Sequence, residues 1–219
     1  MRTPHRTPPP RHPARGHAPQ IGDSGPRHRR RPRQHQNLSH PRDRPARNPR
    51  RGLRRPADHG APPLEFTTGQ ISVDIHSQLT IEAPDYARGF SGLAFHVTPE
   101  LDRFEAIYLR PTNGTLTNTD PPRNTRGIQY FAYPDWPVDR LREEHPGGTY
   151  EAAAPIAPGR WFRLSIDVAA DRITASVDNS EVLHVQTPLA RPSLGAIGLF
   201  VDIGTDAHFA NLTITPSRA

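Results

Sequence analysis

From residue 64 onward, apolar and polar side chains alternate with a period of two, and this alternation restricts the fold more than any other feature. In residues 161–168, for example, Phe162, Leu164, Ile166 and Val168 are separated by polar side chains. An extended strand points successive side chains to opposite faces, so the pattern predicts half-buried antiparallel strands. The expected strands cover residues 70–76, 89–98, 104–110, 127–133, 161–168, 173–178, 182–186, 195–203 and 208–215.

Turn signals separate these strands, such as Asp-Asn-Ser at 178–180 and Gly-Thr-Asp at 204–206. Many short strands with such spacing are typical of a sandwich or a jelly roll. No window predicts a helix of three turns, although residues 138–144 are compatible with one short helical turn. The sequence therefore predicts an all-β fold, an antiparallel β-sandwich of the jelly-roll type.

Residues 1–63 differ in composition from the rest of the chain. They hold 14 of the 27 prolines and 16 of the 28 basic residues, with Asp23, Asp43 and Asp58 as their only acids, whereas residues 64–219 have 12 basic and 19 acidic residues. A segment so poor in apolar side chains cannot bury enough surface to offset the entropy lost on ordering. We therefore expect a disordered Arg/Pro-rich tail over 1–63 and one folded domain over 64–219.

Two interpretations of this tail stay open. Its arginine runs, such as residues 27–31, suit an arm that binds nucleic acid or another anionic surface, although the tail lacks the interleaved aromatic residues of single-strand binders. Arg/Pro/His-rich sequence also results when a GC-rich gene is translated upstream of its true start or out of frame. Because the folded domain is acidic, nucleic-acid binding is expected at most in the tail, and we assign the tail no function.

The sequence lacks several features that would indicate other classes of protein. It contains no cysteine and no apolar run near the ~18 residues of a membrane span, so we expect neither disulfides nor a membrane anchor. The N-terminus has no apolar stretch like that of a secretory signal, so the chain as written is expected to be cytoplasmic, or secreted if its true start differs. No cofactor or metal site is predicted: Asp202 and Asp206 could hold a structural calcium ion, but they lack an oxygen-rich loop pattern.

Several segments between residues 90 and 215 together resemble a known superfamily. They are GLAFH at 92–96, FEAIYLRP at 104–111, QY at 129–130, PDW at 134–136, GRW at 159–161, GAIGL at 195–199 and FANL at 209–212. This set resembles the concanavalin A-like lectin/glucanase jelly roll, and within it the 3-keto-disaccharide hydrolase-like domains and the C-terminal module of exo-inulinases. The resemblance covers most of residues 66–215 and implies a domain that binds sugars, cleaves glycosidic bonds or serves as an accessory module. It does not choose between these functions, because one fold hosts many.

The run from Glu100 to Glu105 resembles the E-[IL]-D-x-x-E strand motif of laminarinase-type glucanases. A retaining glycosidase needs its two carboxyl groups about 5–5.5 Å apart, so the acids must share one face of a strand. Here residues 98–103 are expected to form a hairpin turn, and Glu105 has the opposite parity to Glu100 and Asp102. A solvated turn is the favoured interpretation of this run.

A sugar-binding surface is predicted from the outward positions of the central strands. His96, Tyr108, Arg110 and Gln129 are expected to share the face opposite the aliphatic side chains. A long connection over residues 134–159 is expected to bring further contact residues to the rim of this face, namely Asp135, Trp136, Arg140 and Tyr150. An aromatic ring stacks on the C–H patches of a sugar, while Arg, Gln and Asp bond its hydroxyls. The predicted partner is therefore an oligosaccharide, bound on the concave face of the sandwich.

Two other functions stay open. An enzyme of the 3-keto-disaccharide hydrolase type would use acids near the same face, with Glu105, Asp135 and Glu151 as the candidates. A protein-interaction domain would have no sugar ligand. An enzyme requires two titratable groups that converge on one pocket, at least one of them with a perturbed pKa, and this requirement separates the first alternative from simple binding.

Overall fold

The computed structural model describes residues 53–54 and 65–217 of the chain. Most of the predicted tail lies outside these residues, so its predicted disorder is not tested. Within that tail, Leu53–Arg54 forms a two-residue strand, β1, which pairs antiparallel with β11 (Gly195–Val201).

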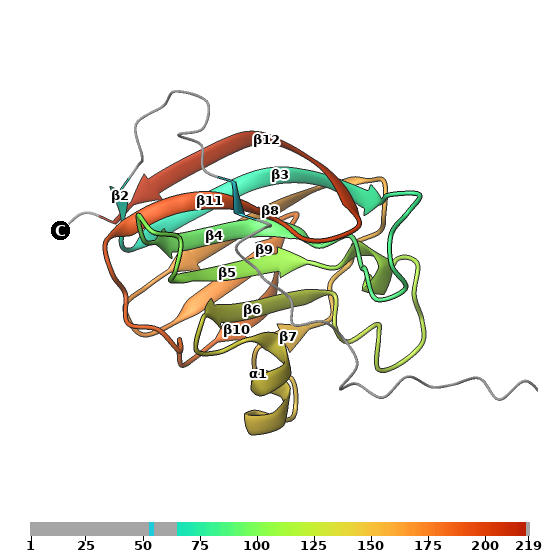
Figure 1. The fold of residues 1–219 in the computed structure, drawn as a ribbon, viewed down its shortest axis with the longest axis horizontal. Coiled ribbons are helices and arrows are strands. Elements are labelled where there is room, and N and C mark those ends of the chain that lie inside the picture. The colour runs from blue at the N-terminus through green and yellow to red at the C-terminus, as the bar shows by residue number, and fades with distance from the viewer. Residues whose placement is uncertain (1–52, 55–64, 218–219) are drawn as a thin grey trace, which may run out of the picture. The chain divides into compact units, whose positions relative to one another are not determined.

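The described residues form two antiparallel sheets that lie one behind the other (Figure 1). Sheet A has the order β1-β11-β4-β5-β6-β7, and β2 also pairs with β11. Its other strands are β2 (Glu65–Phe66), β4 (Ser91–Val97), β5 (Phe104–Leu109), β6 (Ile128–Tyr133) and β7 (Glu151–Ala152). Sheet B has the order β10-β9-β8-β3-β12. Its strands are β3 (Gly69–Leu79), β8 (Trp161–Val168), β9 (Ile173–Val177), β10 (Ser180–Val185) and β12 (Thr205–Pro216).

The chain changes sheet several times along its course. After β3 in sheet B it runs through β4, β5, β6 and β7 in sheet A, and then through β8, β9 and β10 in sheet B. The last two strands, β11 and β12, complete sheet A and sheet B. This is the jelly-roll arrangement that the resemblance implies. The predicted fold class, an all-β antiparallel sandwich, is confirmed.

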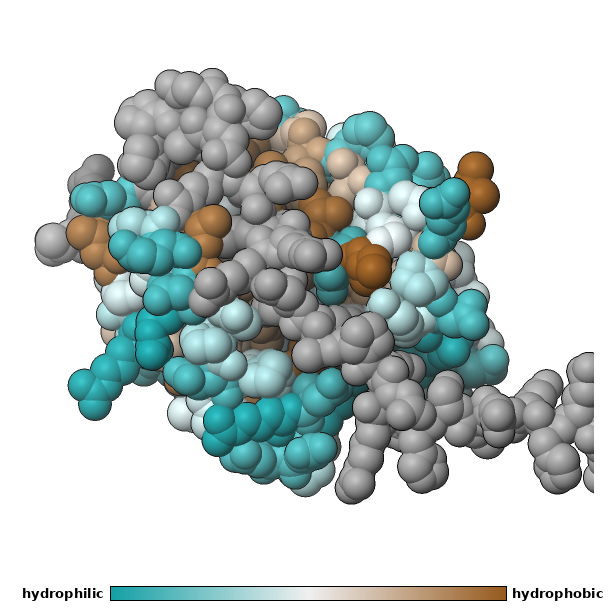
Figure 2. All heavy atoms as spheres, in the orientation of Figure 1, coloured by the Kyte–Doolittle hydropathy of each residue, from teal (hydrophilic) through white to brown (hydrophobic). Residues whose placement is uncertain are grey.

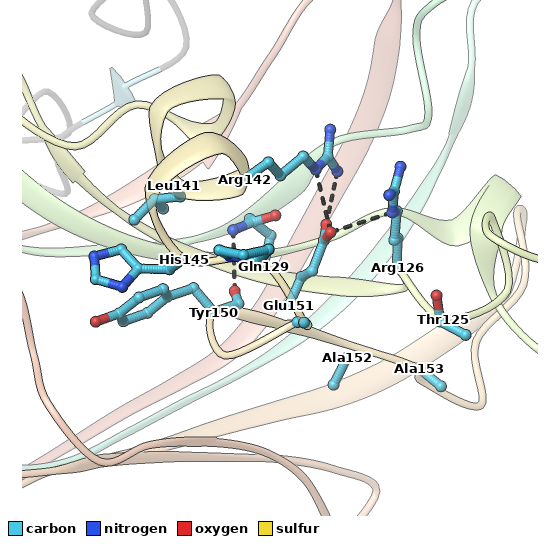
Figure 3. Close-up of a pocket in the computed structure, with 13 residues that line it drawn as sticks. Thr125, Arg126, Gln129, Leu141, Arg142, His145, Tyr150, Glu151, Ala152 and Ala153 are labelled. Carbon is cyan, nitrogen blue, oxygen red and sulfur yellow. Dashed lines mark hydrogen bonds and ion pairs between the residues drawn. The ribbon is translucent and has the colours of Figure 1, made fainter.

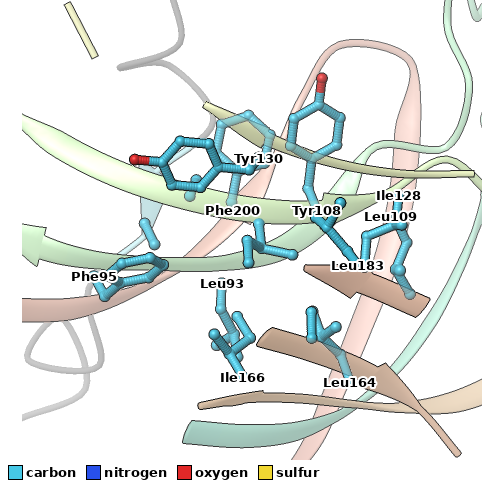
Figure 4. Packing of buried hydrophobic residues seen from close by; sticks show 14 of the residues in the cluster. Leu93, Phe95, Tyr108, Leu109, Ile128, Tyr130, Leu164, Ile166, Leu183 and Phe200 are labelled. Carbon is cyan, nitrogen blue, oxygen red and sulfur yellow. The ribbon is translucent and has the colours of Figure 1, made fainter. Parts of the chain in front are cut away.

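The hydrophobic core lies between the sheets and follows the predicted alternation. On β8, every second side chain from Phe162 to Val168 is buried, whereas the side chains between them are half-buried or exposed. Figure 4 shows Leu164 and Ile166 from sheet B pointing toward Leu93 of sheet A, while Tyr108 and Phe200 lie farther from sheet B. The face of sheet A that points away from sheet B is called the outer face below.

One short helix, α1 (Val138–Glu144), lies next to β6 at the end of sheet A (Figure 1). It begins after Pro137 and buries only Leu141, as expected of a short surface helix. A 3-10 helix, η4 (Pro111–Asn113), follows β5. Among the described residues, none of the helices is long and apolar enough to cross a bilayer.

The core predicts a position-dependent cost for removing a leucine side chain. Leu164 is fully buried between the sheets, so Leu164→Ala should lower the free energy of unfolding by about 3 kcal/mol through lost burial and the cavity left behind. Urea unfolding measures this change, and Leu116→Ala, at a leucine that is 49% exposed, is the matched control. Equal losses at the two positions would contradict the described packing.

Candidate functional site

The outer face of sheet A carries a group of polar side chains that hydrogen-bond to one another. Tyr108 on β5 lies directly opposite Gln129 on β6. Arg110, which follows β5, donates from Nη2 to the Tyr108 hydroxyl at 3.0 Å and to Gln129 Oε1 at 2.8 Å. The Gln129 amide nitrogen donates to the main-chain carbonyls of Tyr130 and Tyr150, at 2.7 and 3.0 Å. The structure thus brings together three of the predicted contact residues, but all three are buried and their polar atoms engage each other.

These residues position the carboxylate of Glu151 on β7. Arg110 Nη1 lies 2.9 Å from Glu151 Oε2, and Arg142 on α1 forms a two-point contact, with Nη2 at 2.6 Å from Oε2 and Nε at 3.1 Å from Oε1. Arg126 Nε lies 3.2 Å from Oε1. Glu151 is therefore held by three guanidinium groups, from the residue after β5, from α1 and from the segment before β6. Figure 3 shows two of them, those of Arg142 and Arg126.

The arginines keep Glu151 ionised. Burial raises the pKa of this carboxyl, but the hydrogen bond from Arg142 and the positive charges of Arg142 and Arg110 outweigh burial and hold the pKa below its usual value. Only 10% of the Glu151 side chain is exposed, so water screens these interactions weakly.

A pocket of about 620 Å³ opens beside this carboxylate. It is lined by Thr125, Arg126, Gln129, Leu141, Arg142, His145, Pro146, Gly147, Gly148, Tyr150, Glu151, Ala152 and Ala153. The strands β6 and β7 provide its floor, α1 and the turn after it provide one side, and Arg126 stands on the other (Figure 3). The surface around α1, at the bottom of the view in Figure 2, is hydrophilic. We refer to this cavity as the Glu151 pocket.

Three aromatic rings pack in a row next to α1, and the outermost of them, Trp136, lies outside the lining of the Glu151 pocket. His145 packs edge-on against Tyr150, with ring centroids 5.2 Å apart, and Trp136 packs on His145 at 5.4 Å. The guanidinium of Arg140 lies over the Trp136 ring, 4.1 Å from its centroid. The long connection was expected to bring Trp136 and Tyr150 to the rim of the outer face. Tyr150 is instead buried: its ring also stacks on Tyr130 at 5.6 Å, and its hydroxyl donates to the Thr187 carbonyl at 3.1 Å.

Asp135 and Arg140 lie outside the lining of the Glu151 pocket. Asp135 is exposed and pairs with Arg103 at 3.3 Å. Arg140 pairs with Glu144 on the same helix at 2.7 Å and donates to the Asp135 main-chain carbonyl at 2.8 Å. Both residues belong to the exposed surface beyond Trp136.

His96 does not share the outer face with Tyr108, which corrects the expectation from alternation. Phe95 and His96 of β4 together lie opposite the single Ile197 of β11, where the register shifts, and His96 adopts a left-handed φ of 54°. Such a bulge turns the side chain that follows it to the other face. His96 therefore points into the sandwich, where Nδ1 lies 2.6 Å from Glu105 Oε2 and Nε2 lies 2.7 Å from the Thr67 carbonyl.

Glu105 is part of this buried network on the core side of sheet A. The Tyr130 hydroxyl donates to Glu105 Oε1 at 2.5 Å and accepts the Leu189 main-chain N–H at 3.0 Å. Burial and the negative charge of Glu105 raise the pKa of Tyr130 far above its usual value, so the hydroxyl keeps its proton. Glu105 and Glu151, two of the three candidate acids, are thus on opposite faces of one sheet.

The glucanase-like run forms a turn between β4 and β5, as expected. Leu101 has a positive φ of 57°, and the Thr98 hydroxyl donates to Asp102 at 2.6 Å across the turn. The calcium candidates also have local partners, since Asp202 accepts the Ile203 N–H at 2.7 Å and Asp206 accepts from Gln78 at 3.3 Å. Within the described part of the chain, no group of three or more metal-ligating side chains could hold an ion.

Sequence reasoning missed Arg126, Arg142 and His145. Glu151 is followed by three alanines, and an acid in such an apolar setting requires cationic partners if it is buried. That requirement could have directed attention to the nearby arginines. It could not have selected Arg142 over Arg140, because the choice depends on how α1 is rotated against β6.

Removing the Tyr130 hydroxyl tests the buried network. Tyr130→Phe leaves the Leu189 N–H and one Glu105 oxygen without their partner, so the free energy of unfolding should fall by about 1–3 kcal/mol. Urea unfolding followed by tryptophan fluorescence measures this change. An unchanged midpoint would show that the network does not contribute to stability.

Acid titration tests the arginine clamp on Glu151. Because the pKa of Glu151 is lowered in the folded state, its contribution is complete above the ordinary value of 4.5 and is lost as the pH falls through the folded-state pKa. At pH 7, Glu151→Gln should lower the free energy of unfolding by about 3 kcal/mol. The difference between the two proteins should shrink steadily below about pH 4.5, measured by urea unfolding at several pH values. A difference that is constant with pH would contradict the clamp.

Comparison with known proteins gave no matching family model and no matching curated protein. Among solved structures, the chain is similar to the carbohydrate binding module CBM66 from Bacillus subtilis, with 15% identity, a TM-score of 0.46, and coverage of 69% of this chain and 76% of that one. It is also similar to a variant of human galectin-16, with 14% identity, a TM-score of 0.44, and coverage of 71% and 94%. A third is the galectin LEC-6 from Caenorhabditis elegans, with 12% identity, a TM-score of 0.36, and coverage of 68% and 89%.

Proposed function

We propose that this protein is a carbohydrate-binding module that holds an oligosaccharide in the Glu151 pocket. The observation that carries the proposal is the arrangement of Arg126 and Arg142, which are fixed by Glu151 at the wall of an open pocket of about 620 Å³. The side chains of these arginines are 37% and 34% exposed, so they are accessible to a ligand. A pocket of this size with charged groups at its wall can hold a small saccharide.

The arginines at the pocket match the oxygens of a sugar. Each guanidinium has five N–H donors, and the contacts with Glu151 use only one or two of them in Arg126 and Arg142. The remaining donors can bond pairs of neighbouring oxygens in a planar fork.

The same geometry favours binding over hydrolysis. Glycosidases use a pair of carboxyl groups that flank one bond. Among the described residues that line the Glu151 pocket, Glu151 is the single acid, and its lowered pKa does not suit a proton donor. Glu105 lies on the other face of sheet A, and Asp135 pairs with Arg103 on the exposed surface. The three candidate acids do not converge.

Two arginines on the same helix provide the test. The full chain is titrated calorimetrically with a panel of neutral and acidic oligosaccharides, and the best ligand is then used with Arg142→Ala and Arg140→Ala. Arg142→Ala removes charge-assisted hydrogen bonds to the ligand, so its affinity should be at least about tenfold lower than that of the unaltered protein. The affinity of Arg140→Ala should differ by less than about twofold. Melting temperatures establish that both variants are folded, and Arg142→Lys, which keeps the charge but not the fork, should also bind more weakly.

Three outcomes would overturn the proposal. Weaker binding by Arg140→Ala alone would move the site to the surface around Trp136. Cleavage of any oligosaccharide, detected by mass spectrometry, would show that the protein is a glycoside hydrolase. Failure of the folded protein to bind any member of the panel would favour a protein-interaction domain.

A further inference from the structure

The Glu151 pocket carries more positive than negative charge. Three arginines surround one carboxylate. A second acid, Asp139, is exposed on α1, and its negative charge helps to raise the pKa of Arg142. This local excess contrasts with residues 64–219 as a whole, which hold 12 basic and 19 acidic residues. A quarter of the domain's arginines thus gather at one carboxylate of an acidic domain.

Both oxygens of the carboxylate at the centre of this cluster are engaged by arginines. Oε1 accepts from Arg142 Nε at 3.1 Å and lies 3.2 Å from Arg126 Nε, while Oε2 accepts from Arg110 Nη1 at 2.9 Å and from Arg142 Nη2 at 2.6 Å. A carboxylate offers about four lone-pair sites. Three hydrogen bonds and one further ion pair engage both oxygens, so Glu151 orients the arginines and has little capacity left for a ligand hydroxyl.

The donors on the arginines are not exhausted in the same way. In the described part of the chain, the structure shows no partner for Nη1 of Arg142 or for either terminal nitrogen of Arg126. Arg110 differs, since its terminal nitrogens contact Tyr108, Gln129, Glu151 and the Arg126 carbonyl. The charged surface of the pocket therefore offers guanidinium donors and no free carboxylate acceptor. A ligand group that only accepts hydrogen bonds is therefore favoured next to these arginines over a hydroxyl that must also donate one.

We propose that the saccharide bound in the Glu151 pocket is acidic, a uronic acid whose carboxylate pairs with Arg126 and Arg142. This inference rests on the proposed function and names the class of sugar. A guanidinium matches a planar carboxylate with two parallel hydrogen bonds, so the two half-exposed arginines form a receptor for that group. Glu151 acts through the arginines and is a positioning residue.

A pair of ligands that differ only in charge tests the inference. An oligogalacturonide and its fully methyl-esterified form are titrated into the full chain by calorimetry at low and at moderate ionic strength. The free acid should bind at least about tenfold more tightly than the ester, since hydrogen bonds to charged groups are the stronger ones. The advantage of the acid should shrink as salt is added, because the arginines are partly exposed and screened, whereas affinity for the ester should change little.

Arg126→Gln is the informative variant. It removes one guanidinium while Arg110 and Arg142 still hold Glu151, so the fold should persist. The preference for the acid over the ester should fall at least about threefold, with a much smaller change in affinity for the ester. Arg123→Gln, at an exposed arginine outside the pocket lining, removes the same net charge and should leave the preference unchanged.

The outcomes separate the two proposals. Equal affinity for acid and ester would overturn the acidic ligand and leave the carbohydrate-binding module standing. Binding of neither form, nor of any other saccharide, would overturn both. Acetate or sulfate alone binding as tightly as the oligogalacturonide would show a simple anion site. Tighter binding of a sulfated oligosaccharide than of the uronide would overturn the uronic acid and identify a sulfate ester as the group that the arginines bind.

Discussion

The ion pair between Arg110 and Glu151 connects the parts of the molecule on which the candidate site depends. Arg110 follows β5, Glu151 lies on β7, and the β6 side chain of Gln129 accepts from the same guanidinium. Their side chains are 4% and 10% exposed, so the pair has lost most of its water. Such a pair is stable only when its remaining donors and lone pairs are satisfied, and here Tyr108, Gln129, Arg126 and Arg142 satisfy them. Three strands and one helix are thereby fixed around one carboxylate.

Sheet A has one polar network on each face, because successive side chains of a strand point to opposite faces. Glu105 and Tyr108 are both on β5 but have opposite parity, so Glu105 joins His96 and Tyr130 in the core while Tyr108 joins Arg110 on the outer face. The networks meet in β6, because Gln129 belongs to one and Tyr130 to the other, and the Gln129 amide donates to the Tyr130 carbonyl at 2.7 Å. Stabilising the core side of β6 therefore also fixes the strand that supports the pocket.

The strands and the outer-face group could be predicted from the sequence because both follow from a period of two. The placement of Tyr108 opposite Gln129 needs only strand pairing in the expected order. His96 was misplaced because a bulge adds one residue to β4, and a bulge leaves no signal in an alternating pattern. Arg126 and Arg142 were missed because their relation to Glu151 depends on loop and helix geometry, which no periodicity specifies. The sequence thus predicts the sheet well and the charged lining of the pocket poorly.

The distribution of exposure explains why the buried residues of the outer face support a site rather than form it. Tyr108, Arg110 and Gln129 are all buried, and their polar atoms are used among themselves. A ligand could not bond them without breaking that network. Arg126 and Arg142 share the same carboxylate but stand at its exposed side, with donors to spare. Side chains held in place before a ligand arrives lose little freedom when it binds. In the proposed site, the rigid buried group would therefore lower the entropic cost of binding at the two arginines above it.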